Sequence, residues 1–419
     1  MKKIAVISGS LLLILVLFFC FYKNERIENI AFEMPEEKKE IRIAWNWEND
    51  DVKALAFKEL MRKFEEKNPN INLKYEYLGN SSFYTNLQVD FASGNETDIV
   101  SARPGYTIRE LITRGKISSL PYDEQKHSGK VGTYIVNSNV YGISLEKYYA
   151  GLLVNCDLLE SLGLNVPETY EELIYVADKL KTEDIIPVSC CFPEYQALLY
   201  QALICGFGGD GALSEGVDEK GISDAYLWGL ELIKELYAKE VFSSDTMEIS
   251  VDESVRRFKE KEAAMLFVKS GHRGNGELTK LNDRTVLIPF PPYYRENQEE
   301  ARLCSLGDAT FYWSRKSYND VEKQDILQEL FEFITEEGNV KFFSENAKVL
   351  SWGETGKEKA FYEYEFVENS TARLLPSAAF DELDWYNYIE HKISGILVEE
   401  INPEIVLEAA ENRQKSYRK

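Results

Sequence analysis

The chain has 419 residues, of which 44% are apolar, 13% aromatic and 28% charged. Its length exceeds what one hydrophobic core usually serves and predicts two lobes of roughly 150 to 200 residues each, while the composition argues against a disordered chain, a collagen-like fibre or a multi-span membrane protein. Lys and Arg number 48 against 71 Asp and Glu, and no basic run is long enough to follow a phosphate backbone, so no nucleic-acid partner is predicted.

The amino terminus carries two lysines followed by an uncharged apolar run from Ile4 to Tyr22. A basic start and an apolar segment are typical of a signal peptide and predict export. Cys20 indicates a lipoprotein, in which cleavage leaves this cysteine as the acylated first residue; Leu17 fits the lipoprotein pattern, whereas Phe18 and Phe19 do not. An uncleaved span is the alternative, because the run at ~1.5 Å per residue would reach ~28 Å, about the hydrocarbon thickness of a bilayer.

Residues 1–22 are therefore predicted to be a signal peptide or membrane anchor, and the polar residues 23–39 to be a spacer. Both interpretations tether the rest of the chain, by lipid or by a helix, at the extracellular face of the cell membrane.

The hydrophobic pattern of the first part of the chain predicts alternating strands and helices. Residues 41–47 have the pattern of a strand, and residues 52–68 that of an amphipathic helix that ends at Asn68 before a proline. A strand over 73–78, a helix over 83–92 and a short strand over 98–101 follow. This order predicts right-handed crossovers and a mainly parallel sheet.

The pattern restarts after residue 145. A strand is predicted over 152–154, and Thr169 with Glu172 forms a capping box that opens a helix. The remaining predicted elements are strands over 186–188, 263–267 and 286–289 and helices over 197–205, 226–238, from 255, 325–335 and 405–414. The fold class predicted is α/β, with two lobes that each contain a sheet.

Cysteine and histidine spacing indicates no metal or cofactor. Without Cys20, five cysteines remain, and an odd count without a Cys-x-x-Cys pair argues against a disulfide framework. The adjacent Cys190 and Cys191 are predicted to be buried free thiols, with a strained vicinal disulfide as the alternative. His127, His272 and His391 are far apart and lack the short spacings of zinc sites.

Several fragments resemble a known family in their order and spacing. They are Phe64-Glu-Glu-Lys-Asn-Pro-Asn-Ile71, the stretch 87–99 with its Gly-Asn-Glu-Thr-Asp-Ile ending, Leu152-Leu-Val-Asn155, Asp157-Leu-Leu-Glu-Ser-Leu-Gly163, Pro167-Glu-Thr-Tyr-Glu-Glu172, Phe258-Lys-Glu-Lys-Glu-Ala-Ala-Met265 and Ile393-Ser-Gly395. Together they resemble the extracellular solute-binding proteins of ABC importers, family 1, in the sugar-binding branch that includes the maltose-binding protein. The likeness covers about residues 40–415.

This resemblance implies a two-lobe, periplasmic-binding-protein-like fold of type II with hinge crossovers near 142–148, 303–307 and 348–351. Lobe 1 would comprise residues 40–145 and 307–349, and lobe 2 residues 146–306 and 350–419. It implies no enzyme, but a protein that captures a small solute, a mono- or oligosaccharide, by lobe closure and delivers it to the transmembrane subunits of a permease.

Candidate ligand residues follow from the expected cleft. In α/β sheets ligands lie beyond the carboxyl ends of strands, and sugars need aromatic faces and planar polar groups. In lobe 1 the candidates are Asn46, Trp47, Glu48, Arg103 and Tyr106, whereas Trp45 is predicted to pack in the core. Ala102 stands where relatives often carry an aromatic residue.

Lobe 2 and the hinge supply the remaining candidates. The resemblance indicates Tyr148 near the hinge, Glu194 and Tyr195 in a loop before a helix, Asp308 at the second crossing, and Trp385 with Tyr386 at the start of a late helix. His272 stands where relatives often carry tryptophan in Gly-x-Trp, so it would offer a hydrogen-bonding ring in place of a stacking platform.

The sequence also allows two other functions and contains one motif similar to a nucleotide-binding fingerprint. Gly206-x-Gly208-x-x-Gly211 matches a dinucleotide fingerprint but follows a predicted helix, so it is interpreted as a turn. A tethered sensor subunit for a membrane kinase would use the same cleft. A secreted glycosidase needs two carboxylates about 5–10 Å apart, and Asp381, Glu382 and Asp384 are such a cluster only by coincidence in so acidic a chain.

Overall fold

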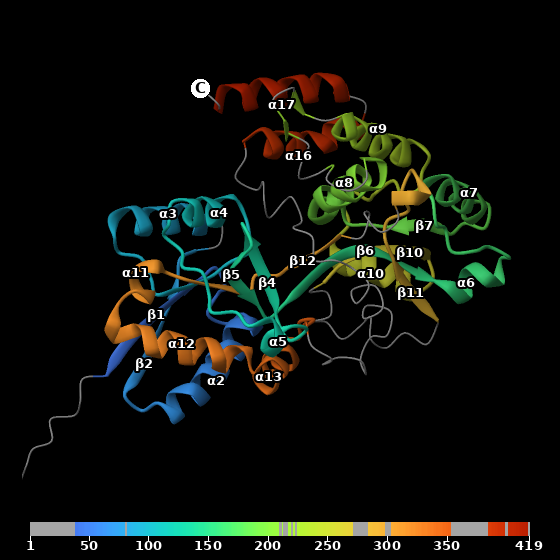
Figure 1. Ribbon diagram of the computed structural model, residues 1–419. Helices are drawn as coiled ribbons and strands as arrows, with labels where there is room; N and C mark the ends of the chain where they lie inside the picture. The colour runs from blue at the N-terminus through green and yellow to red at the C-terminus, as the bar shows by residue number, and fades with distance from the viewer. Residues whose placement is uncertain are drawn as a thin grey trace, which may run out of the picture.

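The computed structural model describes residues 38–79, 82–208, 212, 217–218, 221–222, 224–270, 284–297, 303–352, 384–398 and 401–417. In this part of the chain, helices surround two larger β-sheets that lie side by side (Figure 1). Cys20, His272, the predicted anchor and nearly all of the predicted spacer lie outside the described residues.

The first sheet has six strands in the order β2-β1-β3-β13-β5-β4. Its strands are β1 (Lys39–Trp45), β2 (Ile71–Tyr77), β3 (Ile99–Ser101), β4 (Gly132–Val136), β5 (Asn139–Ser144) and β13 (Thr310–Trp313). β1 pairs in parallel with β2 and β3, as the β-α-β-α-β order predicted. β13 runs antiparallel to β3 and β5, so the chain returns to complete this sheet after building the second one.

Seven helices of the described chain accompany the first sheet. They are α2 (Val52–Lys67), α3 (Phe83–Ser93), α4 (Tyr106–Thr113), α5 (Glu124–His127), α11 (Arg315–Tyr318), α12 (Val321–Thr335) and α13 (Glu337–Ala347). α2 illustrates why these residues form a helix that packs on the sheet. The Asp51 side chain accepts a hydrogen bond from the Lys53 N–H and caps the first turn, and Phe57, Leu60 and Phe64 are buried on one face. The end predicted at Asn68 is confirmed.

The second sheet has the order β11-β6-β10-β7, with β12 beside β6. Its strands are β6 (Lys147–Asn155), β7 (Ile186–Ser189), β10 (Ala263–Lys269), β11 (Thr285–Ile288) and β12 (Leu303–Leu306); a two-stranded sheet joins β8 (Val217–Asp218) and β9 (Gly221–Ile222). β6 pairs antiparallel with β10, and also with β12 near its start and β11 near its end. β6 is therefore hydrogen-bonded to neighbours over its whole length.

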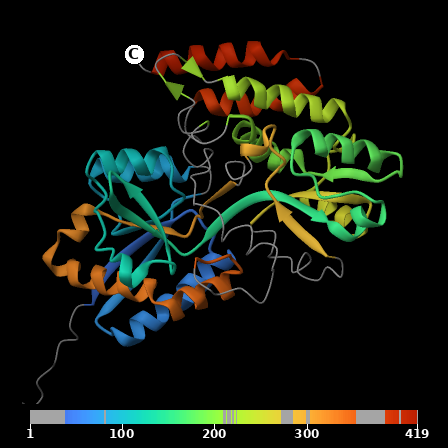
Figure 2. The ribbon, with the colours of Figure 1, turned by 45° about the vertical axis from the view of Figure 1, so that its right-hand side comes forward.

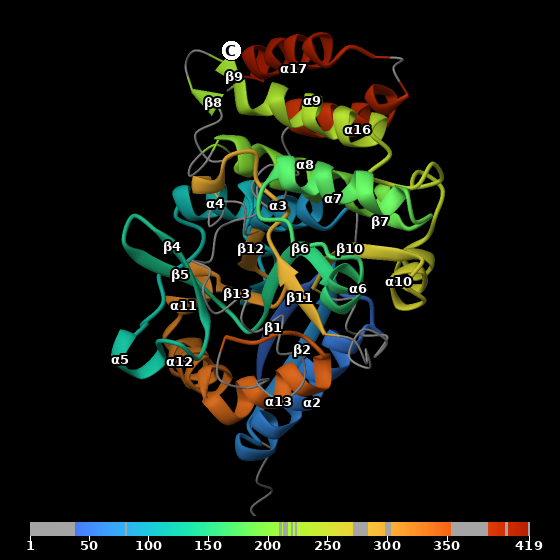
Figure 3. The same ribbon diagram turned by 90° about the vertical axis from the view of Figure 1, so that its right-hand side faces the viewer.

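Helices of the second sheet are α6 (Cys156–Ser161), α7 (Tyr170–Lys181), α8 (Phe192–Gly208), α9 (Asp224–Ala238), α10 (Val251–Lys259), α16 (Asp384–Leu397) and α17 (Pro403–Tyr417), with a short 3-10 turn, η3 (Arg295–Asn297). Figure 3 shows α17 as the outermost layer above α9 and α16. The predicted cap of α7 is confirmed, since the Thr169 hydroxyl accepts a hydrogen bond from the Glu172 N–H.

Several predicted boundaries differ from the structure, and one of them affects candidate ligand residues. The sequence places Glu194 and Tyr195 in a loop, but α8 already begins at Phe192, so both residues lie in its first turn. Pro193 is compatible with a helix start, where its missing N–H has no helical partner to lose, and the burial of Phe192 and Tyr195 holds this turn on the core.

The chain passes between the two sheets at three places. Figure 2 shows β5 leading through residues 145–146 into the long β6, and residues 307–309 lead from β12 back to β13. After α13, Leu350 pairs with Lys147 at the start of β6. Near this third crossing the Trp352 indole N–H donates to the Glu146 carbonyl, 3.3 Å away, and the Lys147 ammonium lies 4.6 Å from the indole centre.

Candidate functional site

Five side chains meet where the chain crosses between the sheets, and we call them the interlobe cluster: Lys53, Arg103, Glu146, Tyr148 and Asp308. Lys53 comes from the first turn of α2 and Arg103 follows β3, so both belong to the first sheet's side. Tyr148 lies in β6 of the second sheet, while Glu146 and Asp308 lie on the first two crossings. Elements from both lobes therefore contribute to one site.

Lys53 is the central cation of the cluster. Its Nζ lies 3.0 Å from Glu146 Oε1 and 3.4 Å from Asp308 Oδ2. Burial opposes the charge on Lys53, but the attraction of these two carboxylates outweighs it and raises the pKa of Lys53 above its ordinary value. Lys53 is thus a fixed positive charge at the junction.

Glu146 holds the crossings together. Its buried carboxylate accepts hydrogen bonds from Lys53 Nζ and, at 3.2 Å, from the Ala309 N–H on the second crossing. The Glu146 side chain occupies the space where a Cβ on residue 307 would lie, so the chain passes here only because Gly307 has no side chain. Glu146 therefore joins two separate crossings through one carboxylate.

Arg103 and Asp308 form the other half of the cluster. Arg103 Nε donates to Asp308 Oδ1, and its guanidinium carbon lies 5.9 Å from the centre of the Tyr148 ring. Burial works against ionisation of Asp308, but Arg103 and Lys53 together hold the pKa of its carboxyl well below the usual range. Burial raises the pKa of Tyr148, so its phenol stays neutral.

The second sheet extends the cluster with a further cation. The Lys269 Nζ, at the end of β10, lies 5.3 Å from the centre of the Tyr195 ring on α8. Burial lowers the pKa of Lys269, and Glu194 opposes this effect by attraction. Five predicted ligand residues, Arg103, Tyr148, Glu194, Tyr195 and Asp308, thus lie in or beside one region.

The segment after β1 contributes differently from expectation. Trp47 is 3% exposed and stacks on Trp45 with ring centres 5.4 Å apart, in the core of the first sheet. Glu48 is exposed. The Asn46 amide oxygen and the Trp47 indole nitrogen are buried, and neither has a hydrogen-bond partner in the part of the chain that the structure describes. Such atoms are costly to leave unsatisfied, so they mark a place for water or ligand.

Three other predicted residues lie apart from the cluster. Tyr106 begins α4 and is 45% exposed. Trp385 and Tyr386 lie at the start of α16, where the helix was predicted, but both are buried. Trp385 packs edge-on against Tyr226 at 5.7 Å, and the Tyr386 hydroxyl accepts a hydrogen bond from the Gln201 amide at 2.9 Å. These two side chains pack in the core of the second lobe.

Sequence reasoning missed Lys53, Glu146 and Lys269. Lys53 sits in a helix whose pattern accounts for it as a surface residue, and Lys269 ends a strand without any motif. Glu146 falls within the first predicted crossing, so its position in the expected hinge was the one signal that could have identified it.

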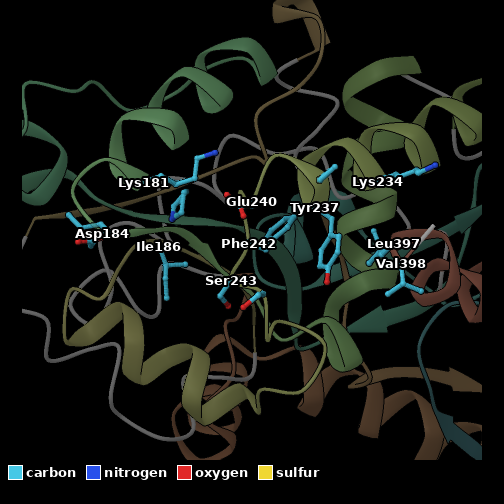
Figure 4. Close-up of a pocket in the computed structure, with 14 residues that line it drawn as sticks. Lys181, Asp184, Ile186, Lys234, Tyr237, Glu240, Phe242, Ser243, Leu397 and Val398 are labelled. Carbon is cyan, nitrogen blue, oxygen red and sulfur yellow. The ribbon is translucent and has the colours of Figure 1, made fainter. Parts of the chain in front are cut away.

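Two surface pockets lie elsewhere. A cavity of about 780 Å³ opens at the edge of the second sheet, lined by the ends of α7, α9 and α16 and the start of β7. Figure 4 shows Tyr237 and Phe242 in its middle and Lys181 and Lys234 at its rim. A second cavity of about 600 Å³ lies among α2, α5 and α12. Neither is lined by a predicted ligand residue, and the convergence of charged side chains singles out the interlobe cluster instead.

The described residues contain no group of three or more His, Cys, Asp or Glu side chains that could hold a metal ion. Cys190 and Cys191 are buried free thiols, and burial raises the pKa of both. Within the same residues, no helix is apolar over a length that would cross a bilayer.

Comparison with known proteins gives a family and a relative. A family model for bacterial extracellular solute-binding proteins matches residues 48–341. A multiple sugar-binding protein of Streptococcus mutans is 24% identical over 156 residues, which make up 36% of this chain and 37% of that protein. The match thus spans a little over a third of the length of this curated relative.

Solved structures show the same fold over nearly the whole chain. The binding protein MsmE of Bacillus subtilis, in an open conformation, superposes with a TM-score of 0.74 at 15% identity over 91% of this chain and 98% of the other. A sugar transporter of Bacillus licheniformis in complex with stachyose gives a TM-score of 0.66 at 16% identity over 89% and 98%. The predicted two-lobe α/β fold is confirmed. Since the family model matches most of the chain and the fold agrees with it, this protein belongs to the bacterial extracellular solute-binding proteins.

Proposed function

We propose that this protein captures a mono- or oligosaccharide between its two lobes and delivers it to the membrane subunits of an ABC importer. The observation that carries the proposal is the interlobe cluster, because it joins side chains of both lobes at the crossings around which the lobes would move. The sugar-binding name of the streptococcal relative and the stachyose complex of the structural neighbour favour a carbohydrate ligand.

The cluster supplies the groups that a sugar needs. Arg103 and the carboxylates of Asp308 and Glu194 are planar hydrogen-bonding groups, and Tyr148 and Tyr195 are aromatic rings that can pack against C–H faces. We include Asn46, Trp47 and Glu48 because the unpartnered Asn46 oxygen and Trp47 nitrogen lie at the same end of β1 from which α2 brings Lys53. Tyr106, His272, Trp385 and Tyr386 remain proposed contacts without a structural argument of this kind.

The mechanism follows from differential affinity. A ligand that contacts both lobes only when they are closed shifts the population toward the closed form, and that form is what a permease would recognise. A micromolar affinity needs only about 8 kcal/mol, which a few hydrogen bonds and aromatic contacts provide after ordering costs. Binding and release suffice for this role, without any bond being made or broken.

Calorimetry with purified residues 38–419 tests the proposal. Stachyose, galactose, xylo-oligosaccharides and chitin oligosaccharides are titrated separately, and saturable binding without turnover of the sugar is expected for at least one. Binding that survives unchanged in an Arg103→Ala, Tyr148→Ala double variant would place the sugar elsewhere. Release of smaller sugars would support the glycosidase, and pull-down of a kinase ectodomain in place of permease subunits would support the sensor.

The tether is a separate part of the proposal. The amino-terminal sequence supports lipid attachment at Cys20 after cleavage, with an uncleaved span over 4–22 as the alternative. Mass spectrometry of the protein purified from membranes distinguishes them, since a diacylated peptide beginning at Cys20 is expected and an intact Met1 would exclude the lipoprotein.

A further inference from the structure

A cluster of exposed aromatic rings lies on the second lobe, and none of its members belongs to the interlobe cluster. The rings are Phe207, Trp228, Tyr293 and Tyr294, which we call the aromatic platform. Phe207 is half-buried, while Trp228, Tyr293 and Tyr294 are 42–44% exposed. They come from the end of α8, the first turns of α9 and the loop after β11 (Figure 1).

The rings are in mutual contact. Phe207 stacks on Trp228 with ring centres 5.0 Å apart and an interplanar angle of 21°. Its ring centre also lies 5.5 Å from those of Tyr293 and Tyr294, which are 5.0 Å from each other. The platform is therefore a continuous set of rings around Phe207.

The backbone holds the platform in place. The Gly206 carbonyl at the end of α8 accepts hydrogen bonds from the N–H groups of Tyr293 and Tyr294, at 3.1 and 3.4 Å. The Asn297 amide donates to the Phe207 carbonyl at 3.1 Å. A Cβ on residue 206 would lie 2.9 Å from the Pro292 Cα, so the loop approaches the helix as closely as glycine permits. Rings fixed in this way lose little further freedom on binding.

An arginine and two glutamates border the platform on one side. Arg295 forms ion pairs with both Glu168 and Glu172, so these three side chains together carry one negative charge, which disfavours an anionic ligand. Tyr293 and Tyr294 add phenol hydroxyls to the platform, and the two residues are 42% and 43% exposed. A neutral ligand that offers apolar faces beside hydroxyl groups is the chemistry that matches such a surface, and carbohydrate has both.

The small exposed area of the platform favours a carbohydrate ligand over a protein partner. An aromatic side chain buries roughly 150–250 Å² when fully covered, so rings less than half exposed offer on the order of 300 Å² together. A stable protein interface takes about 800 Å² per partner, which is far more than the area of the four rings. A sugar chain needs only the ring faces.

The platform is distinct from the interlobe site. Tyr195, in the first turn of α8, faces Lys269 and the interlobe cluster, whereas Phe207 lies twelve residues later on the same helix. At 1.5 Å per residue the two are separated by about 18 Å. We infer that the aromatic platform is a second carbohydrate site, which holds a polysaccharide or long oligosaccharide on the surface of the second lobe while the interlobe site takes the transported sugar.

Affinity electrophoresis tests this inference with soluble xylan, dextran and glycol chitin in the gel. Residues 38–419 are expected to be retarded by at least one of them, and Trp228→Ala and Tyr294→Ala are each expected to weaken the retardation at least fivefold. Tyr175→Ala is the matched control, because Tyr175 is an exposed aromatic residue of the same lobe that lies outside the platform. Thermal unfolding of each variant verifies that it is folded.

The outcomes separate this inference from the proposed function. Arg103→Ala should leave the retardation intact, and Trp228→Ala should leave calorimetric sugar binding intact; retardation that depends on Trp228 would stand even if no sugar bound between the lobes. The inference fails if none of the three polysaccharides retards the protein, or if Tyr175→Ala has the same effect as Trp228→Ala. It also fails if Trp228→Ala abolishes capture by the permease while retardation persists.

Discussion

The interlobe cluster and the start of α16 both bury polar side chains, but they are held by different forces. Lys53, Glu146 and Asp308 come from separate chain segments and are joined by charge. Trp385 and Tyr386 belong to one helix and are held by packing on α8 and α9 inside one lobe. The first arrangement depends on how the two lobes are placed, whereas the second moves with its lobe. A residue predicted to line a cleft can thus be held by packing within one lobe.

The largest effect is expected from Trp385→Ala. Because the side chain is buried in the second lobe, its truncation should lower the free energy of unfolding by about 3–5 kcal/mol. Urea denaturation of the variant measures this, with Tyr175→Ala as an exposed control. If stability is unchanged while sugar affinity falls more than tenfold, Trp385 is a ligand contact and the distinction drawn above is incorrect.

The second largest effect on stability is expected from Glu146→Gln. The variant leaves the half-buried Lys53 without its nearest carboxylate, which should cost about 3 kcal/mol of stability. In a double-mutant cycle, Lys53→Met combined with Glu146→Gln should destabilise less than the sum of the two single variants. Simple additivity would show that the ion pair does not couple the two segments.

Arg103→Ala should act on binding more than on stability. Removing its guanidinium takes away a hydrogen-bonding group of the proposed site, so sugar affinity should fall at least tenfold, or about 1.4 kcal/mol. Stability should change by less than about 1 kcal/mol, because the ion pair with Asp308 is partly exposed. Arg114→Ala, which removes a surface pair with Glu110, is the matched control and should leave affinity unchanged.

The smallest effect concerns pH. The pKa of Asp308 is held below its ordinary value of ~3.9, so its contribution to stability is present above that pH and is lost as the pH falls through the lower, folded-state value. Asp308→Asn should flatten the acid limb of the plot of stability against pH below about pH 4. An acid limb with the same slope in both proteins would assign the effect to other carboxylates.

Local patterns were sufficient for much of the fold. The periodicity of residues 52–68 and the cap at Thr169 follow from contacts within a few residues, and the structure has both. The pairing of β13 with β3 and β5 was not predicted, because it joins segments far apart in the chain and no local pattern encodes it. A tryptophan suits a hydrophobic core as well as a sugar-binding cleft, so the residue type of Trp47 alone did not predict where its side chain lies.

The candidate site was predictable only in part, because it too depends on contacts between segments far apart in the chain. Arg103 and Asp308 were identified by their positions after a strand and at a crossing, which the family resemblance supplied. Lys53 became recognisable only when three-dimensional proximity to Glu146 and Asp308 was known. An amphipathic helix accepts a lysine in its first turn without any sign that the residue faces another segment.

The pairing of β6 along its whole length has a mechanical consequence. Because β12, β10 and β11 pair with this strand from Lys147 to Asn155, the strand resists bending, and a rotation of one lobe against the other would have to be taken up in the crossings, such as Leu145 and Glu146 just before it. In the proposed closure β6 would move as a rigid body, with the ion pair between Glu146 and Lys53 next to the point of rotation. Weakening the ion pair between Glu146 and Lys53 would then change the angle through which the lobes rotate without altering the structure of either lobe.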